Sequence, residues 1–168
     1  MTGLSSVSLL ALVLIAGPLA AQDLARPEGD VLLTVTGAIG VTNDGDAAAF
    51  DRAMLEELDP VTIETTTIWT DGVQTFTGVP LDRLMDVVGA TGTSVDATAI
   101  NDYSVAIPAS DWVDGGPIVA FLNNGEPMSV RDKGPLWIVW PFDDNPAFQT
   151  ETIYSRSIWQ LDRIVVTE

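Results

Sequence analysis

The 168-residue sequence contains no cysteine and no histidine, and only seven of its residues are basic. Without cysteine or histidine the chain cannot build a thiol nucleophile, a Ser-His-Asp triad, a zinc site made of those side chains, a histidine-ligated haem or an iron–sulfur cluster. Any catalysis would therefore depend on carboxylates, tyrosine, lysine or a borrowed cofactor. The lack of disulfides does not argue against export, because a domain of this size does not need them.

The basic residues are outnumbered by 24 acidic ones, which gives a formal net charge of −17. A surface of this charge repels phosphate backbones and anionic lipid headgroups. We therefore expect that the protein binds no nucleic acid and, once its N-terminal segment is removed, does not bind a membrane directly.

The first 21 residues carry no charged side chain. An apolar run at 7–16 precedes Gly17-Pro18 and the small pair Ala20-Ala21, which is the layout of a secretory signal and its cleavage site. The run is shorter than the roughly 20 residues needed to cross a bilayer. We expect a signal peptide at 1–21, export, and one mature domain at 22–168. A retained anchor or a buried strand is the alternative.

The remaining sequence is dominated by short strand patterns. Alternating or β-branched segments predict strands at 31–37, 61–69, 95–100, 103–107, 118–122, 128–130, 136–140 and 158–166. Helices are expected at 46–58, capped by Asp44 or Asp46, and between Pro80 and Gly89. There is no internal repeat and no linker. The sequence predicts a single α+β domain with a mainly β core.

Large aromatic side chains usually fill a protein core, and the chain has five tryptophans: Trp69, Trp112, Trp137, Trp140 and Trp159. Trp137 and Trp140 share one predicted strand and lie on its opposite faces, because an odd offset reverses the direction of a side chain. One of them is therefore expected to face a pocket or a second layer. Trp140, beside Pro141 at the start of a loop, is the better pocket candidate.

Two polar clusters interrupt the apolar strands. In the first, Asn101, Asp102 and Tyr103 suit the edge of a planar heterocycle, because a carboxylate accepts two N–H bonds, an amide both donates and accepts, and a phenol ring stacks. The second cluster, at 154–159, places the basic residue Arg156 between two aromatic rings. An ordinary turn and a solvated arginine are the respective alternatives.

Other acidic or turn-rich segments do not match known sites. The runs at 43–46 and 143–145 lack the ligand spacing and the distal Glu of an EF-hand calcium loop, and solvated turns are expected there. No glycine-rich phosphate cradle follows a predicted strand. Paired carboxylates for glycoside hydrolysis stay open, because the sequence does not give the distance between acidic residues.

Five segments occur in an order that is characteristic of one family. They are TFTGVPL at 75–81 followed by Leu84, AINDYSV at 99–105, NNGEPM at 123–128, GPLWIVWP at 134–141 and WQLDRI at 159–164. Together, across roughly residues 61–166, they resemble the oxidoreductase molybdopterin-binding domain, which has the sulfite oxidase type of fold. Enzymes of this type hold molybdenum through a cysteine thiolate, and this chain has no cysteine.

The sequence is thus similar to a small, exported, metal-free branch of this fold, some members of which bind pterins. The resemblance implies a periplasmic protein that binds a pterin and signals to a membrane-bound partner, either a cyclic di-GMP-metabolising enzyme or a sensor kinase. It implies a pterin as ligand in place of the molybdenum cofactor, and no catalytic or metal-binding residue. A molybdopterin-dependent oxidoreductase and a ligand-free interaction module on the same fold are the alternatives.

The resemblance places the ligand among eight residues: Trp69, Asn101, Asp102, Tyr103, Trp140, Tyr154, Arg156 and Trp159. Trp140, Tyr103 or Tyr154 would stack on the pterin ring. Stacking and a few buried hydrogen bonds, at roughly 1 kcal/mol each, are enough for micromolar affinity.

The polar members of this set would recognise the edge of the ring. Asp102 and Asn101 would bind its amino and ring N–H groups, and Arg156 would donate to its carbonyl. No phosphate contact is then needed, which suits a chain with so few cations. This interpretation requires Asp102, Tyr103, Trp140 and Arg156 to surround one shared hollow.

Overall fold

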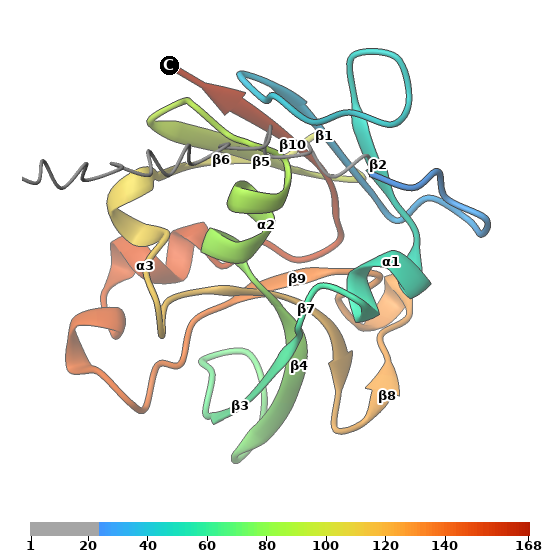
Figure 1. Cartoon of the computed structure of the whole chain (residues 1–168). Coiled ribbons are helices and arrows are strands. Elements are labelled where there is room, and N and C mark those ends of the chain that lie inside the picture. Colours follow the sequence, from blue (N-terminus) through green and yellow to red (C-terminus); the bar gives the residue numbers. More distant parts are fainter. Residues whose placement is uncertain (1–23) are drawn as a thin grey trace, which may run out of the picture.

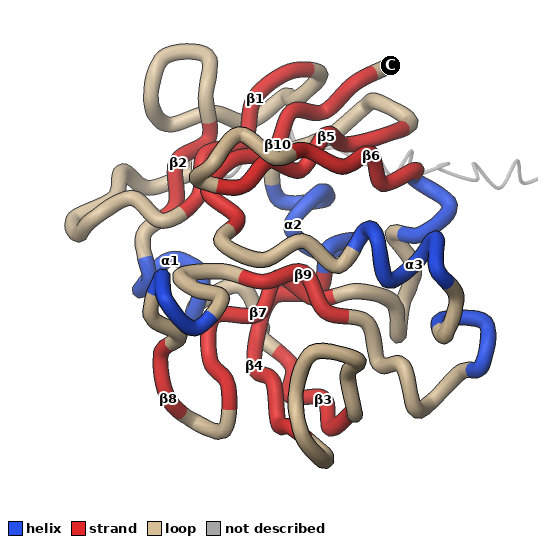
Figure 2. Tube along the Cα trace, turned by 180° about the vertical axis from the view of Figure 1, so that it is seen from behind, coloured by secondary structure: helices blue, strands red, loops and turns tan. Residues whose placement is uncertain are grey.

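The computed structural model describes residues 24–168, so the signal peptide predicted at 1–21 lies outside the described residues. Two β-sheets lie one above the other, and short helices lie between and beside them (Figure 1). Seen from behind, α1 (Arg52–Glu56) and α3 (Glu151–Arg156) lie at opposite ends of the region between the sheets (Figure 2). This is the mainly β, α+β architecture that the sequence predicts.

The first sheet has the strand order β2-β1-β10-β5-β6. Its strands are β1 (Leu33–Gly37), β2 (Ala48–Phe50), β5 (Ser94–Ala99), β6 (Ser104–Pro108) and β10 (Leu161–Thr167). β1 and β10 are parallel, and the other neighbouring strands are antiparallel. Because the first and the last of these strands pair with each other, this sheet joins the two ends of the described chain.

The second sheet is built around β7, which pairs with β4, β8 and β9. Its strands are β3 (Val61–Thr65), β4 (Gln74–Pro80), β7 (Ile118–Asn123), β8 (Glu126–Pro127) and β9 (Trp137–Val139). The turn at Asn124-Gly125 has left-handed φ values of 52° and 80°, as expected of an Asn-Gly hairpin. Pairing resumes directly at 126–127 and not at the predicted 128–130, because a two-residue turn leaves no spare residue.

The remaining elements are helical: α2 (Leu81–Val87) and the 3-10 turns η1 (Ala109–Asp111), η2 (Val130–Asp132) and η3 (Pro146–Phe148). α2 confirms the helix predicted after Pro80. Leu81, Leu84 and Met85 are buried on its inner face, and Gly89 follows with a φ of 59°, a conformation that glycine adopts without strain.

The helix predicted at 46–58 is shorter than expected. Residues 48–50 pair with β1 as the strand β2, so α1 begins only at Arg52. Asp51 is the cap, and its carboxylate accepts the backbone N–H of Met54 at 2.9 Å. This hydrogen bond, followed by that from the N–H of Gly29, lowers the pKa of Asp51 below its ordinary value. α3 was not predicted at all.

Candidate functional site

A cavity of about 360 Å³ opens where the β5–β6 hairpin, the end of α3 with the segment that follows it, and the loop after β3 meet. Its size lies within the roughly 300–1,000 Å³ that is common for ligand pockets. The lining residues are Trp69, Ala99, Asn101, Tyr103, Tyr154, Ser155, Ser157, Ile158, Trp159 and Gln160. Five of the eight predicted site residues are among them: Trp69, Asn101, Tyr103, Tyr154 and Trp159.

One side of the cavity, the aromatic wall, consists of Trp69, Tyr154 and Trp159. The Trp69 ring lies edge-on to the other two, with centroid distances of 5.9 Å to Tyr154 and 5.5 Å to Trp159. It also meets the buried ring of Trp137 at 5.9 Å, and Trp137 donates its indole N–H to the carbonyl of Ser157 at 3.2 Å. Edge-to-face contacts are a preferred geometry for aromatic rings, so this wall is formed before any ligand binds.

Gln160 lines the cavity but was not among the predicted site residues. It follows Trp159 and has a left-handed φ of 54°. Its backbone N–H donates to the carbonyl of Lys133 at 3.0 Å, and its own carbonyl accepts the N–H of Ile100 at 2.9 Å. Its side chain donates to the carbonyl of Val130 at 2.6 Å. Gln160 thus ties the hairpin and the loop before β9 to the aromatic wall.

The other side, the hairpin wall, consists of Asn101 and Tyr103 at the tip of the β5–β6 hairpin. The N–H of Ala99 donates to the carbonyl of Tyr103 at 2.8 Å, and Asp102 has a φ of 66°, which is the geometry of a three-residue hairpin loop. The side-chain oxygen of Asn101 accepts the N–H of Tyr103 at 3.2 Å. Tyr103 is 57% exposed, which leaves its side chain accessible to a ligand.

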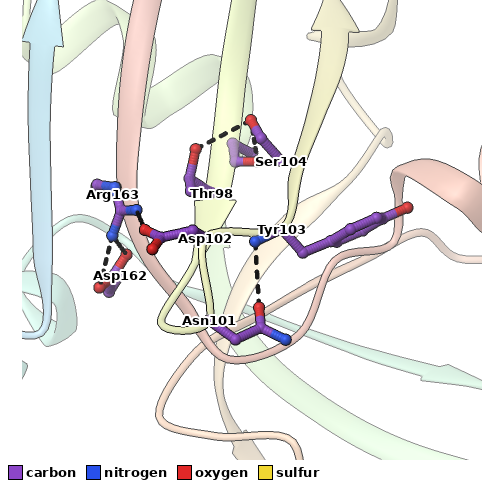
Figure 3. A network of polar contacts seen from close by, with 8 residues as sticks. Thr98, Asn101, Asp102, Tyr103, Ser104, Asp162 and Arg163 are labelled. Carbon is purple, nitrogen blue, oxygen red and sulfur yellow. Dashed lines mark hydrogen bonds and ion pairs between the residues drawn. The ribbon is translucent and has the colours of Figure 1, made fainter.

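Asp102 does not line the cavity. Figure 3 shows its side chain on the side of the hairpin opposite to Tyr103, paired with Arg163 of β10. Arg163 also binds Asp162 at 2.9 Å. In this structure Asp102 is therefore not placed to meet the edge of a ligand in the cavity. Its partner is 61 residues away in the sequence, and neighbouring residues of a tight loop point in different directions.

Trp140, the pocket candidate that the sequence favoured, is also outside the cavity, and Trp137 does not line it either. Both side chains are 0% exposed, Trp137 within β9 and Trp140 directly after it. Alternation along a strand separates the two rings but does not tell which face meets a pocket. Trp137 is the one that supports the site, through its contacts with Trp69 and Trp159.

Arg156 likewise does not line the cavity. Its guanidinium forms an ion pair of 2.7 Å with Asp111 of η1, and both side chains are largely buried. The neighbouring residues Ser155 and Ser157 reach the cavity instead. Arg156 thus joins α3 to η1, and the prediction that Asp102, Tyr103, Trp140 and Arg156 surround one hollow is wrong: of these four, Tyr103 alone lines it.

The lining of the cavity is aromatic and polar but carries no charged side chain among residues 24–168. One cation lies beside the aromatic wall: the ammonium of Lys133 is 5.9 Å from the ring centroid of Trp159 and 5.7 Å from that of Trp137. The site therefore offers flat ring faces, two side-chain amides and the hydroxyl of the exposed Tyr103. These are the groups that recognise a planar heterocycle.

The residues present do not fit a molybdenum ion. The chain contains no cysteine to supply a thiolate. Within the described part of the chain, no group of three or more acidic side chains is arranged to hold a metal. The cavity suits an organic ring better than a metal centre.

Within residues 24–168, no helix has the length and apolarity needed to span a membrane.

The two sheets and their helices form a mainly β, α+β fold of the sulfite oxidase type. One similar solved structure is the sulfane dehydrogenase SoxCD from Paracoccus pantotrophus, with a TM-score of 0.58 and 17% sequence identity. The match covers 80% of this chain but 37% of SoxCD, so the chain spans well under half of that protein. A likeness at this identity establishes the fold alone. No protein-family model and no curated protein matches the sequence.

Proposed function

We propose that the protein is a periplasmic pterin-binding protein and that the cavity is its binding site. The observation that carries this proposal is the preformed aromatic wall beside a cavity of about 360 Å³. Stacking of a heterocyclic base on an aromatic side chain contributes roughly 1–3 kcal/mol. A pterin is a flat bicyclic heterocycle, so stacking alone supplies much of a micromolar affinity.

The roles of the site residues differ from those expected from the sequence. Tyr103 and Trp159 are both accessible, so either ring can stack on the ligand. Asn101 takes over the recognition of the ring edge, because its amide both donates and accepts. Asp102 and Arg156 do not contact the ligand in this proposal, because each is engaged in an ion pair away from the cavity.

The location and the partner are part of the same proposal. The uncharged segment 1–21 supports export. A membrane-bound cyclic di-GMP-metabolising enzyme or sensor kinase would then detect whether the cavity is filled. Ile100 and Val130, which are exposed next to the cavity, offer apolar contacts to such a partner.

A catalytic role is not proposed. An oxidoreductase of the sulfite oxidase type would need a thiolate on molybdenum, and the chain has no residue that supplies one. A ligand-free interaction module is also disfavoured, because the packed rings of Trp69, Tyr154 and Trp159 leave a cavity beside them.

The proposal is tested by titrating the exported protein with a reduced pterin while following tryptophan fluorescence and heat. We expect a change in emission and a micromolar Kd, lost in Trp159→Ala and retained in Trp112→Phe, a tryptophan variant outside the cavity. No change in emission together with no heat would refute the proposal. Stoichiometric molybdenum in protein from cells that make the cofactor would favour the enzyme instead.

A further inference from the structure

Asp143 joins two loops that are far apart in the sequence. Its carboxylate accepts the backbone N–H of Thr66 at 2.6 Å and the hydroxyl of Thr66 at 2.7 Å. In return, the backbone N–H of Asp143 donates to the hydroxyl oxygen of the buried Thr65 at 3.1 Å. Asp143 follows β9 and Thr66 follows β3, so these three bonds form a clamp between the 141–144 and 65–70 loops. We name these bonds the Asp143 clamp.

The loop held by the Asp143 clamp is the loop that carries Trp69. The backbone N–H of Trp69 donates to the hydroxyl oxygen of Thr67 at 3.1 Å, and the hydroxyls of Thr67 and Thr70 are 2.7 Å apart. The residue next to Thr66 in the chain is thus hydrogen-bonded on both sides of Trp69. The loop has little freedom to move the tryptophan independently of Thr66.

The other side of the Asp143 clamp also touches the aromatic wall. Phe142, the residue before Asp143, lies with its ring centroid 6.4 Å from that of Trp69 and 5.1 Å from that of Tyr154. A shift of the 141–144 loop would therefore disturb the rings directly. Both loops that meet at the clamp carry an aromatic ring of this cluster.

We propose that Asp143 is a positioning residue of the binding site: through Thr66 it fixes the loop of Trp69 and thereby holds the Trp69 ring against the cavity. Its effect on affinity rests on the proposed function, whereas its effect on the Trp69 ring does not. Replacing the carboxylate by an amide leaves a single neutral acceptor oxygen for the N–H and the hydroxyl of Thr66, so the charge and at least one of the two bonds to Thr66 are lost.

Three variants and one matched control test this role. Asp143→Asn and Thr66→Val each weaken the Asp143 clamp, and Thr66→Ser keeps the hydroxyl and is expected to behave as wild type. Asp144→Asn is the control, because it removes the same charge from the next exposed residue. We expect Asp143→Asn to weaken binding of a reduced pterin about tenfold, as for the loss of a hydrogen bond to a charged group. Asp144→Asn should leave the affinity unchanged.

A double-mutant cycle with Trp69→Ala shows whether Asp143 acts through the tryptophan. We expect Asp143→Asn to have little further effect on affinity once Trp69 is absent, since coupled residues are not additive. If the losses of binding free energy in Asp143→Asn and Trp69→Ala simply add in the double variant, the proposal is overturned. A lowered melting temperature with wild-type affinity would overturn it too, because the role of Asp143 would then be structural only.

Near-ultraviolet circular dichroism of the ligand-free protein separates this inference from the proposed function. The difference between the spectra of wild type and Trp69→Phe gives the contribution of Trp69 and the rings that it contacts. We expect Asp143→Asn, still folded, to lose most of that signal and Asp144→Asn to keep it. If the wild-type protein binds no pterin, the proposed function fails, but the spectrum still shows whether the Asp143 clamp positions Trp69. An unchanged spectrum in Asp143→Asn would show that the clamp does not hold Trp69.

Discussion

The two walls of the cavity are built in opposite ways. The aromatic wall is a set of interlocked rings that rests on the buried Trp137. The hairpin wall is the tip of a β-hairpin, with an exposed Tyr103 ring and an ion pair between Asp102 and Arg163 on its far side (Figure 3). One wall is part of the core, and the other is attached to the core from outside.

This difference separates stability from binding. A wall made in advance of the ligand lowers the entropic cost of binding, because its side chains are already ordered. Changes there should affect folding and binding together. Changes in the hairpin wall should affect binding and leave folding nearly intact, because few buried contacts are lost. The four predictions below test this contrast.

The largest effect is expected from Trp137→Ala. The side chain is fully buried, meets the rings of Trp69, Phe76 and Trp159, and donates a hydrogen bond to Ser157. Loss of such a ring destabilises a protein by about 3–5 kcal/mol. The measurement is urea unfolding of the variant beside wild type. A loss below about 1 kcal/mol would mean that the aromatic wall does not depend on the core.

Tyr103→Ala should lower the affinity for pterin and leave the stability of the protein nearly unchanged. Its ring is exposed, so the free energy of unfolding should change by less than about 0.5 kcal/mol. Pterin affinity should fall about tenfold or more, which corresponds to the roughly 1–3 kcal/mol of one stacking contact. Calorimetry gives the affinity, and Val113→Ala, an exposed apolar residue outside the cavity, is the control. A large loss of stability with unchanged affinity would reverse the roles of the two walls.

The sequence predicted those parts of the fold that depend on local signals. The Asn-Gly turn, the helix after Pro80 and the β5–β6 hairpin all carry residue types that favour one local conformation. The helix at 46–58 was overestimated, because residues 48–50 pair with β1 from elsewhere in the chain. Propensity alone does not show when a neighbouring strand competes for a segment.

The candidate site was predicted in part for the same reason. The aromatic members were found because aromatic and polar residues cluster in the sequence. Asp102 and Arg156 were misplaced because their partners, Arg163 and Asp111, are 61 and 45 residues away. Gln160 was missed because its role depends on a left-handed backbone conformation, which a glutamine in the sequence does not predict.

Acid should weaken the aromatic wall through Asp143. The N–H of Thr66, followed by its hydroxyl, lowers the pKa of Asp143 below its ordinary value. The pKa in the folded protein is therefore below that in the unfolded chain, so the stabilisation is complete above about pH 4 and is lost as the pH falls through the folded value. We expect the melting temperatures of wild type and Asp143→Asn to converge at low pH. A gap that stays constant in acid would contradict this assignment.

The smallest effect is expected from Asp102→Asn, which removes the ion pair that holds the hairpin wall from outside. Asparagine tolerates the left-handed backbone at this position, so the charge alone is changed. The Asp102 side chain is 84% exposed, and an ion pair in such a place contributes about 0–1 kcal/mol. We expect an unchanged melting temperature and a loss of pterin affinity of about threefold at most. Added salt should lower the affinity of wild type toward that of the variant, because salt screens exposed charges.

Asp59→Asn is a closely matched control for this last variant. Asp59 also has a left-handed φ, of 50°, is 82% exposed and pairs with an arginine, Arg83, but it does not line the cavity. Its replacement should leave the pterin affinity and its salt dependence as they are in wild type. If Asp102→Asn instead weakens binding as strongly as Tyr103→Ala does, then the ion pair fixes the hairpin wall as firmly as ring packing fixes the aromatic wall. The contrast between the two walls would then lie in where they are held and not in how tightly.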